Sequence, residues 1–302
     1  MTVQESLAAA GYLMGWRVAR LLPERLVLRV AYRAADWACD QGKGMDQLRR
    51  NLARVVGQEN VTRELVRRSM RSYARYWVEA FRLPSMHTRP DLIERLEETI
   101  EGKEHLEASV AKGKGVVLVL PHSGNWDMAG VFLVHHCGAF TTVAERLKPE
   151  VLYQAFVDFR TSLGFQVLPL TGEGSAYPRL KAVLESGGIV CLLGERDIRQ
   201  RGVPTSFFGE ETTMPAGPVK LAEETDAALH VVHSWYPEEG RWGLRCGPEI
   251  PVTNLADTVQ RVATQMEENI RRHPADWHLL QPLWPEDVER RRRLKNRTQG
   301  AK

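Results

Sequence analysis

The residue types most able to do chemistry lie in two polar blocks, Pro121–Asp127 and Gly194–Asp197. The first block contains His122 and Asp127. A carboxylate bonded to one imidazole nitrogen would leave the other nitrogen free to take a proton from an alcohol. In an uninterrupted helix these two residues would lie about 140° apart. A turn followed by a helix that Asn125 caps would instead allow His122 to fold back onto Asp127 as a general base.

The alternative is that His122 and Asp127 merely cap a helix, and the spacing alone favours this interpretation because it occurs by chance in many chains. A helix that begins near Asn125 would also present unpaired N–H groups, which bind an oxyanion or a phosphate. The choice between the two interpretations depends on the elements around the block.

Short apolar runs alternate with helical patterns on both sides of these blocks. We expect strands at residues 116–120, 140–144, 167–170 and 189–193, with helices at 125–137, 149–164 and 178–186 between them. Residues 229–236 and 242–246 predict a hairpin or paired strands added to the sheet, and 256–272 predicts a closing helix. The pattern predicts an α/β fold with an open, mixed, largely parallel sheet flanked by helices. Because ligands bind beyond the carboxyl ends of such strands, the two polar blocks are expected to share one site.

An amphipathic helical region precedes the sheet. Residues 3–22 and 24–38 predict two helices broken by Pro23, and residues 46–82 continue the helical pattern, ending before Pro84. In the second helix a basic stripe lies beside an apolar set that turns away from it. The stripe is Arg25, Arg29 and Arg33, and the apolar set is Leu26, Val27, Val30, Ala34 and Trp37. With the tryptophans Trp16 and Trp37, this favours contact with an anionic bilayer surface, and surface helices packed on the core are the alternative.

Charge is unevenly distributed along the 302 residues, although the net charge is only +3. The first 90 residues hold 16 lysines and arginines against 8 acidic residues, and the last 17 hold 7 against 3. We expect a helical, membrane-associating region at 1–90, an α/β domain at 91–285 and a basic tail at 286–302. The arginine run at 290–293 could touch anionic lipid or RNA, but a solvated, frayed end is the commoner meaning of such a run. No nucleic-acid-binding module is recognisable, so we expect no nucleic acid partner.

Several function classes lack their motifs in this sequence. The four cysteines form no CxxC pair, so we expect neither a metal cluster nor a disulfide framework, and a reducing compartment. No run of 18 uncharged apolar residues occurs, and no basic segment precedes an apolar stretch at the N-terminus, so we expect neither a spanning helix nor a secretory signal. A lipase or esterase is disfavoured because no G-x-S-x-G occurs, and phosphate-binding and dinucleotide loops are absent.

The stretch VVLVLPHSGNWDMAG resembles the signature of the glycerolipid and lipid A acyltransferase superfamily, in which an H-x4-D motif follows a strand and opens a helix. Further blocks of the chain resemble the family as well, and together they extend over roughly residues 5–290. They are Gly194–Asp197, Phe207–Gly209, Met214–Pro218, His273–His278 and Trp284.

Within that superfamily, the chain most resembles the phosphatidylinositol mannoside acyltransferases, because it combines a basic amphipathic N-terminus with the Glu-Arg-Asp of the second block. The resemblance implies transfer of a long acyl chain, such as palmitoyl, from acyl-CoA to a mannose hydroxyl of a phosphatidylinositol mannoside. It also implies a peripheral protein at the cytoplasmic face of the plasma membrane. Acyl transfer to another glycolipid or to a lysophospholipid is the first alternative, and a non-catalytic peripheral membrane protein is the second.

The resemblance also implies roles for individual residues. His122 matches the general base, Glu195 its dyad partner and Asp127 a carboxylate that orients the site, and either acid could hold the imidazole. Arg160, Arg201 and Glu224 resemble acyl-CoA contacts. A solvated surface role has about half the weight for each arginine, and it is the commoner explanation for Glu224.

The implied mechanism needs no cofactor and no metal, since acyl-CoA is a substrate and the deprotonated hydroxyl attacks its activated thioester directly. Four apolar residues after the motif line an acyl channel or belong to the plain core. These are Met128, Val131, Phe132 and Val134.

Overall fold

The computed structural model describes residues 20–40, 45–145, 150–170, 175–198 and 200–300. Seven strands form one sheet in the order β1-β9-β8-β2-β5-β3-β4, and every neighbouring pair is parallel except β8 and β9. The predicted α/β class is confirmed. The strands are β1 (Ile100–Glu101), β2 (Val116–Leu120), β3 (Thr141–Ala144), β4 (Gln166–Pro169), β5 (Ile189–Leu193), β8 (Ala228–Trp235) and β9 (Gly243–Cys246).

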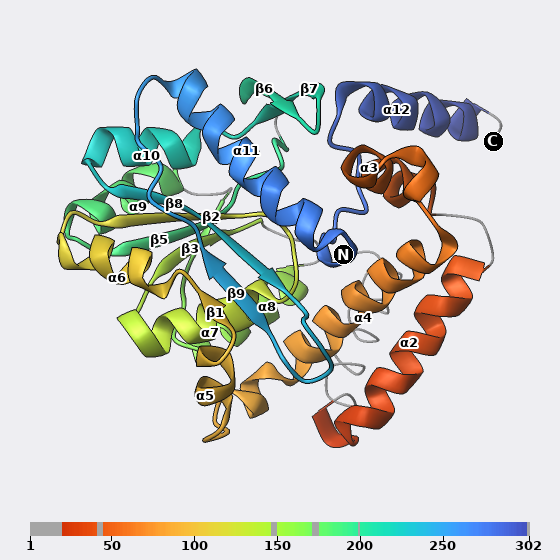
Figure 1. The fold of residues 1–302 in the computed structure, drawn as a ribbon, viewed down its shortest axis with the longest axis horizontal. Helices are drawn as coiled ribbons and strands as arrows, with labels where there is room; N and C mark the ends of the chain where they lie inside the picture. The colour runs from red at the N-terminus through yellow and green to blue at the C-terminus, as the bar shows by residue number, and fades with distance from the viewer. Residues whose placement is uncertain (1–19, 41–44, 146–149, 171–174, 199, 301–302) are drawn as a thin grey trace.

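Two layers of helices cover the two faces of this sheet (Figure 1). One layer holds α9 (Ala176–Glu185), α10 (Gly217–Thr225) and α11 (Leu255–Arg272), and the other holds α5 (Leu92–Glu97), α6 (Lys103–Ala111), α7 (Trp126–Cys137) and α8 (Glu150–Ser162). Side chains of β2 alternate between the layers. Val117 and Val119 pack with the first layer, and Val116 and Leu118 with the second. Burial on both faces explains why the strand is apolar throughout.

A two-stranded hairpin that the sequence did not predict lies outside the main sheet. Its strands are β6 (Val203–Phe207) and β7 (Glu210–Met214), and β6 packs beside α11. The turn takes two residues of positive φ, Phe208 at 52° and Gly209 at 78°. Both values are typical of a tight hairpin turn, although a phenylalanine rarely occupies the first position.

The helical region before the sheet contains α2 (Glu24–Asp40), α3 (Asp46–Val56) and α4 (Arg63–Met86). The predicted continuous pattern over 46–82 is wrong in two respects. A break follows Val56, where Gly57 has a φ of 86° and a 3-10 turn covers Gln58–Asn60. Helix α4 then runs through Pro84, which lies in its last turn and has no N–H to donate to the carbonyl of Ala80, so the helix continues there with one hydrogen bond fewer.

Helix α2 packs against α4 and leaves an apolar face exposed. Asp36 accepts hydrogen bonds from Arg71 at 2.7 and 2.5 Å, which ties the two helices together. Three apolar side chains of α2 remain in solvent: Leu26 is 44% exposed, Val30 59% and Trp37 67%. The predicted helix at 3–22, with Trp16, lies almost entirely outside the described residues. Among the described residues, no helix has the length and apolar composition needed to cross a bilayer.

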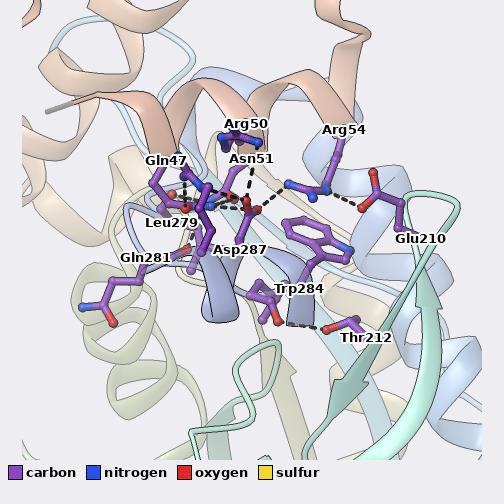
Figure 2. A network of polar contacts seen from close by, with 12 residues as sticks. Gln47, Arg50, Asn51, Arg54, Glu210, Thr212, Leu279, Gln281, Trp284 and Asp287 are labelled. Atoms are coloured by element: carbon purple, nitrogen blue, oxygen red, sulfur yellow. Dashed lines mark hydrogen bonds and ion pairs between the residues drawn. The ribbon is translucent and has the colours of Figure 1, made fainter. Parts of the chain in front are cut away.

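The C-terminal residues form a helix, α12 (Pro285–Gly300), rather than the frayed end that we expected. Asp287 in its first turn is fully buried and accepts hydrogen bonds from Arg54 at 2.7 Å and from Gln47 at 3.0 Å (Figure 2). Both donors belong to α3. A buried carboxylate with charged and amide partners holds a helix end in place, so the basic run that follows begins from a fixed anchor.

Candidate active site

His122 and Glu195 meet where two neighbouring strands end. His122 follows β2 and Glu195 follows β5. Oxygen Oε1 of Glu195 accepts hydrogen bonds from both the backbone N–H of His122, at 2.8 Å, and its ring nitrogen Nδ1, at 2.6 Å. The carboxylate is completely buried, while the imidazole is 24% exposed. The two polar blocks are therefore brought together, as their positions after parallel strands predicted.

This pair fixes the state of the imidazole. A carboxylate only accepts hydrogen bonds, so Nδ1 carries the proton and Nε2 keeps a free lone pair. Burial raises the pKa of the Glu195 carboxyl, but the charge of His122 and its hydrogen bonds lower it by more, so the pKa lies below its usual value. Glu195 thus remains ionised at neutral pH, where it orients the ring and stabilises a proton on Nε2.

Asp127 does not take the place beside the imidazole that the spacing suggested. Its carboxylate accepts from Arg160 Nε at 2.8 Å and from the Tyr76 hydroxyl at 3.0 Å, and it is 2% exposed. Burial lowers the pKa of Arg160, but the charge of Asp127 raises it by more, and the net pKa is above its usual value. Asp127 therefore joins α7 to α8 and α4.

The loop itself is held by the start of α7. Asn125 caps this helix, since its Oδ1 accepts from the Met128 N–H at 2.9 Å. Its Nδ2 donates at 2.7 Å to Glu79, a buried carboxylate that also accepts from Arg75 at 2.6 Å and Trp242 at 2.9 Å. These bonds orient the cap and occupy the Met128 N–H, which leaves the N–H groups of Trp126 and Asp127 in the first turn to bind an anion.

His278 lies next to His122, and the sequence identified it only as part of the block His273–His278 that resembles the family. Its backbone N–H donates to the carbonyl of His122 at 2.7 Å, and its Nε2 lies 2.8 Å from the Ser72 hydroxyl. Burial, and then the charge of His122, lower its pKa to about 3. Tyr76 was not predicted to be a residue of the site. Its ring stacks on Trp126, with the ring centroids 3.9 Å apart. The contacts of His278 and Tyr76 both join segments that lie far apart in the sequence, so local sequence patterns do not predict them.

A cavity of about 320 Å³, here called the His122 cavity, opens beside the imidazole. Aromatic side chains of α4, among them Tyr73 and Trp77, form part of its wall, and Arg160 and His278 contribute polar groups. A narrow space of about 90 Å³, the apolar cavity, adjoins it and shares Trp126 and Arg160 with it. An opening lined by aromatic rings with a few polar groups is typical of a site for an amphiphilic molecule.

The apolar cavity lies between the sheet and the helix layer of α7. Phe132 lines it, as one predicted channel residue, together with Leu118, Phe140 and Phe165. The three other predicted channel residues do not line it. Met128 and Val131 are buried in the core, and Val134 packs against that core.

Arg201 and Glu224 lie farther from the imidazole. Arg201 is exposed and lines a third space of about 650 Å³, the Arg201 cavity, which shares Leu193 and Arg196 with the His122 cavity. Glu224, on α10, is also exposed and accepts from the Tyr177 hydroxyl at 3.0 Å and from Lys181 at 2.9 Å. The structure brings His122 and Arg160 to one cavity, with the buried Glu195 bonded to His122, but leaves Arg201 and Glu224 outside it.

The arrangement can deprotonate a hydroxyl at Nε2 of His122 and return the proton to a leaving group. Among the described residues, no cluster of three or more histidines, cysteines and acidic residues could hold a metal ion. Cys191 and Cys246 are free thiols whose pKa values burial raises, Cys246 to about 12, so these two side chains are poor nucleophiles.

Residues 4–286 match the family of bacterial lipid A biosynthesis acyltransferases. A phosphatidylinositol mannoside acyltransferase of Mycolicibacterium smegmatis is 51% identical over 292 residues, covering 94% of each chain. Phosphatidylinositol mannoside acyltransferases of two Mycobacterium tuberculosis strains are 48% identical, over 95% of this chain and 92% of theirs. The chain therefore belongs to the bacterial lipid A biosynthesis acyltransferase family and is an O-acyltransferase.

Proposed function

We propose that this enzyme transfers a long acyl chain, such as palmitoyl, from acyl-CoA to a mannose hydroxyl of a phosphatidylinositol mannoside. The observation that carries the reaction type is the bond of 2.6 Å between His122 Nδ1 and the buried carboxylate of Glu195. This bond leaves Nε2 as a base inside a cavity wide enough for a sugar. The names of the mycobacterial relatives support the acceptor.

The transfer proceeds in one displacement with His122 as the base. Nε2 takes the proton of the mannose hydroxyl as its oxygen attacks the thioester carbonyl. The tetrahedral oxyanion then collapses and expels the thiolate of CoA, which receives the proton from Nε2. Glu195 stabilises the imidazolium in between, and the N–H groups of Trp126 and Asp127 at the start of α7 would stabilise the oxyanion.

The apolar cavity is the proposed entry of the acyl chain. Its volume of about 90 Å³ holds only a few methylene groups, so its apolar side chains must move apart to admit a palmitoyl chain. The apolar cavity adjoins the His122 cavity at Trp126 and Arg160, so a chain inserted there would hold its thioester near the imidazole. Arg160 lies at this junction. It is proposed to contact acyl-CoA there in addition to pairing with Asp127. Arg201, together with the Tyr177 and Glu224 pair, is the proposed contact for the nucleotide end of CoA in the Arg201 cavity.

The enzyme is proposed to work as a peripheral protein on the cytoplasmic face of the plasma membrane. Support comes from α2, where Leu26, Val30 and Trp37 are exposed beside the predicted basic stripe. Apolar residues that lie in solvent on a helix surface suit the headgroup region of an anionic bilayer.

The direct test is turnover with defined substrates. Purified enzyme is incubated with labelled palmitoyl-CoA and, separately, with a phosphatidylinositol mannoside, lysophosphatidic acid or a lipid A precursor. The proposal predicts labelled product with the mannolipid only. Product with a different acceptor would overturn the proposed substrate, and the same assay with palmitoyl carried on acyl carrier protein tests the donor.

A further inference from the structure

A fourth space, of about 450 Å³, lies beside the site and has no role in the reaction described above. We call it the α12 cavity. Its walls come from the loop after β5, from β7, from the segment at 282–285 and from the first turns of α12. Arg196 lines this space and also lines the His122 and Arg201 cavities, so one residue is common to the walls of all three spaces.

Two arginines face the α12 cavity without an acidic partner. Arg196 donates to the amide oxygen of Gln281 at 2.6 Å, and Arg292 donates to the amide oxygen of Gln200 at 3.2 Å. In the described parts of the chain, neither guanidinium lies within ion-pair distance of a carboxylate. Amide oxygens leave the positive charge of both groups uncompensated.

The two carboxylates that line the same cavity are already engaged. Oδ2 of Asp197 accepts from the Gly202 N–H at 2.6 Å and from the Thr213 hydroxyl at 2.8 Å, which holds the loop after β5 in its turn. Glu289 pairs with Arg293 at 3.2 Å. Neither acid is the partner of the two lining arginines, so their donors remain for a bound anion.

The backbone at both arginines is held in place, although the Arg292 side chain itself is exposed. Arg196 directly follows Glu195 and therefore belongs to the turn that carries the His122 partner. Arg292 lies on α12, which Asp287 anchors to α3 through Arg54 and Gln47 (Figure 2). Guanidinium groups suit bidentate bonds to a phosphate.

We propose that Arg196 and Arg292 form a phosphate subsite, which holds a phosphate group of one substrate while its other end lies in the His122 cavity. The inference rests on the proposed function for the identity of the substrates. Two sources carry the required chemistry: the phosphodiester of the mannolipid and the phosphates of acyl-CoA. Arg196 lies on the wall between the spaces, so a ligand held there can reach His122 from either source.

The test compares Arg292→Ala with Arg291→Ala, which removes the same charge from an exposed position on α12 outside the cavity wall. The KM for each substrate is measured with the other saturating. Arg292→Ala is expected to raise one of the two KM values about tenfold, the effect of losing a charge-assisted hydrogen bond, with kcat within about twofold. A rise for the mannolipid identifies its phosphodiester, and a rise for palmitoyl-CoA identifies CoA. Arg196→Lys, which keeps the charge but loses the fork, should raise the same KM.

Calorimetric titration with glycerophosphoinositol and with CoA tests the subsite without turnover. One of these probes should bind the Arg292→Ala variant about tenfold more weakly than the wild type and the Arg291→Ala variant. If neither Kd and neither KM changes beyond the effect of Arg291→Ala, the subsite is wrong. Weaker probe binding in an enzyme that does not acylate the mannolipid would uphold the subsite and overturn the proposed acceptor.

Discussion

Glu195 lies opposite His122 because β2 and β5 pair in parallel with Leu120 beside Leu193. Each of these two side chains is two residues beyond that pair, so the register of the sheet sets the 2.6 Å bond between them. A shift of one residue would turn one of the two side chains to the other face. The bond between His122 and Glu195 is thus a consequence of strand pairing in the centre of the sheet.

The pairing of Asp127 with Arg160 predicts a large effect on stability. Asp127→Asn would leave a largely buried guanidinium without its countercharge, and we expect the free energy of unfolding to fall by about 3–5 kcal/mol. Urea denaturation followed by fluorescence measures this loss. The double variant Asp127→Asn with Arg160→Met removes both charges and should recover part of the stability. A double variant as unstable as the sum of the single changes would contradict a direct pair.

Two buried histidines predict loss of stability in mild acid. Burial lowers the pKa values of His233 and His278 to about 3, whereas the unfolded chain titrates near 6.5. Below pH 6.5 these two histidines bind protons in the unfolded state but not in the folded state. The free energy of unfolding therefore falls as the pH drops from 6.5 toward 3. At pH 5 each residue accounts for a loss of about 2 kcal/mol.

Urea unfolding at pH 7 and pH 5 tests this dependence in the wild type and in His278→Gln. The variant should lose less stability between the two pH values than the wild type, whatever its stability at pH 7. His135→Gln replaces an exposed histidine of α7 and serves as the control. An unchanged pH dependence in His278→Gln would show that the His278 imidazole does not stay neutral in the fold.

Asn51 predicts a role for α3 in positioning the cavity wall. Its fully buried amide donates to the carbonyls of Leu279 at 2.8 Å and Gln281 at 3.1 Å (Figure 2). Both of these residues line the His122 cavity. Asn51→Ala leaves two carbonyls unsatisfied and should lower stability by about 1–3 kcal/mol and raise the KM for the lipid acceptor. Asn60→Ala, at an exposed asparagine, is the control, and an equal KM in both variants would contradict the positioning role.

The exposed face of α2 predicts both electrostatic and apolar contact with a membrane, and only the electrostatic contact should depend strongly on salt concentration. Replacing Arg25, Arg29 and Arg33 by alanine should weaken binding to anionic vesicles about a hundredfold at low salt, and far less at high salt. Trp37→Ala should weaken binding at both salt concentrations, because it removes apolar contact rather than charge. Vesicle sedimentation measures both effects. Unchanged binding of the triple variant at low salt would contradict the interfacial role of α2.

The sequence was sufficient to predict the centre of the sheet. Strands β2 and β5 were recognisable because residues 116–120 and 189–193 are short, apolar runs that each follow a glycine and end at a proline or a glycine. Because the two polar blocks follow these neighbouring parallel strands, the sequence also predicted that the blocks would meet. The hairpin of β6 and β7 was missed because its residues are largely polar and include Pro204, so they lack the pattern of a buried strand.

The partner of the imidazole could not be chosen from sequence. The five-residue spacing suggested a contact between Asp127 and His122, but the Asp127 carboxylate instead accepts hydrogen bonds from Arg160 on α8 and Tyr76 on α4. Such contacts depend on helix packing across the sheet, which local spacing does not encode. The same limit applies to His278, which reaches His122 only through a backbone bond between distant segments.

The proposed role of His122, held by Glu195, is to act as the general base of acyl transfer. It is tested by kcat for transfer of palmitoyl to the mannolipid by His122→Ala and Glu195→Gln, with folding checked by circular dichroism. We predict that kcat falls by about 10²- to 10⁴-fold in His122→Ala, and also falls in Glu195→Gln, where the charge that stabilises the imidazolium is lost. A His122→Ala enzyme that retains kcat within about tenfold of the wild type would contradict the account.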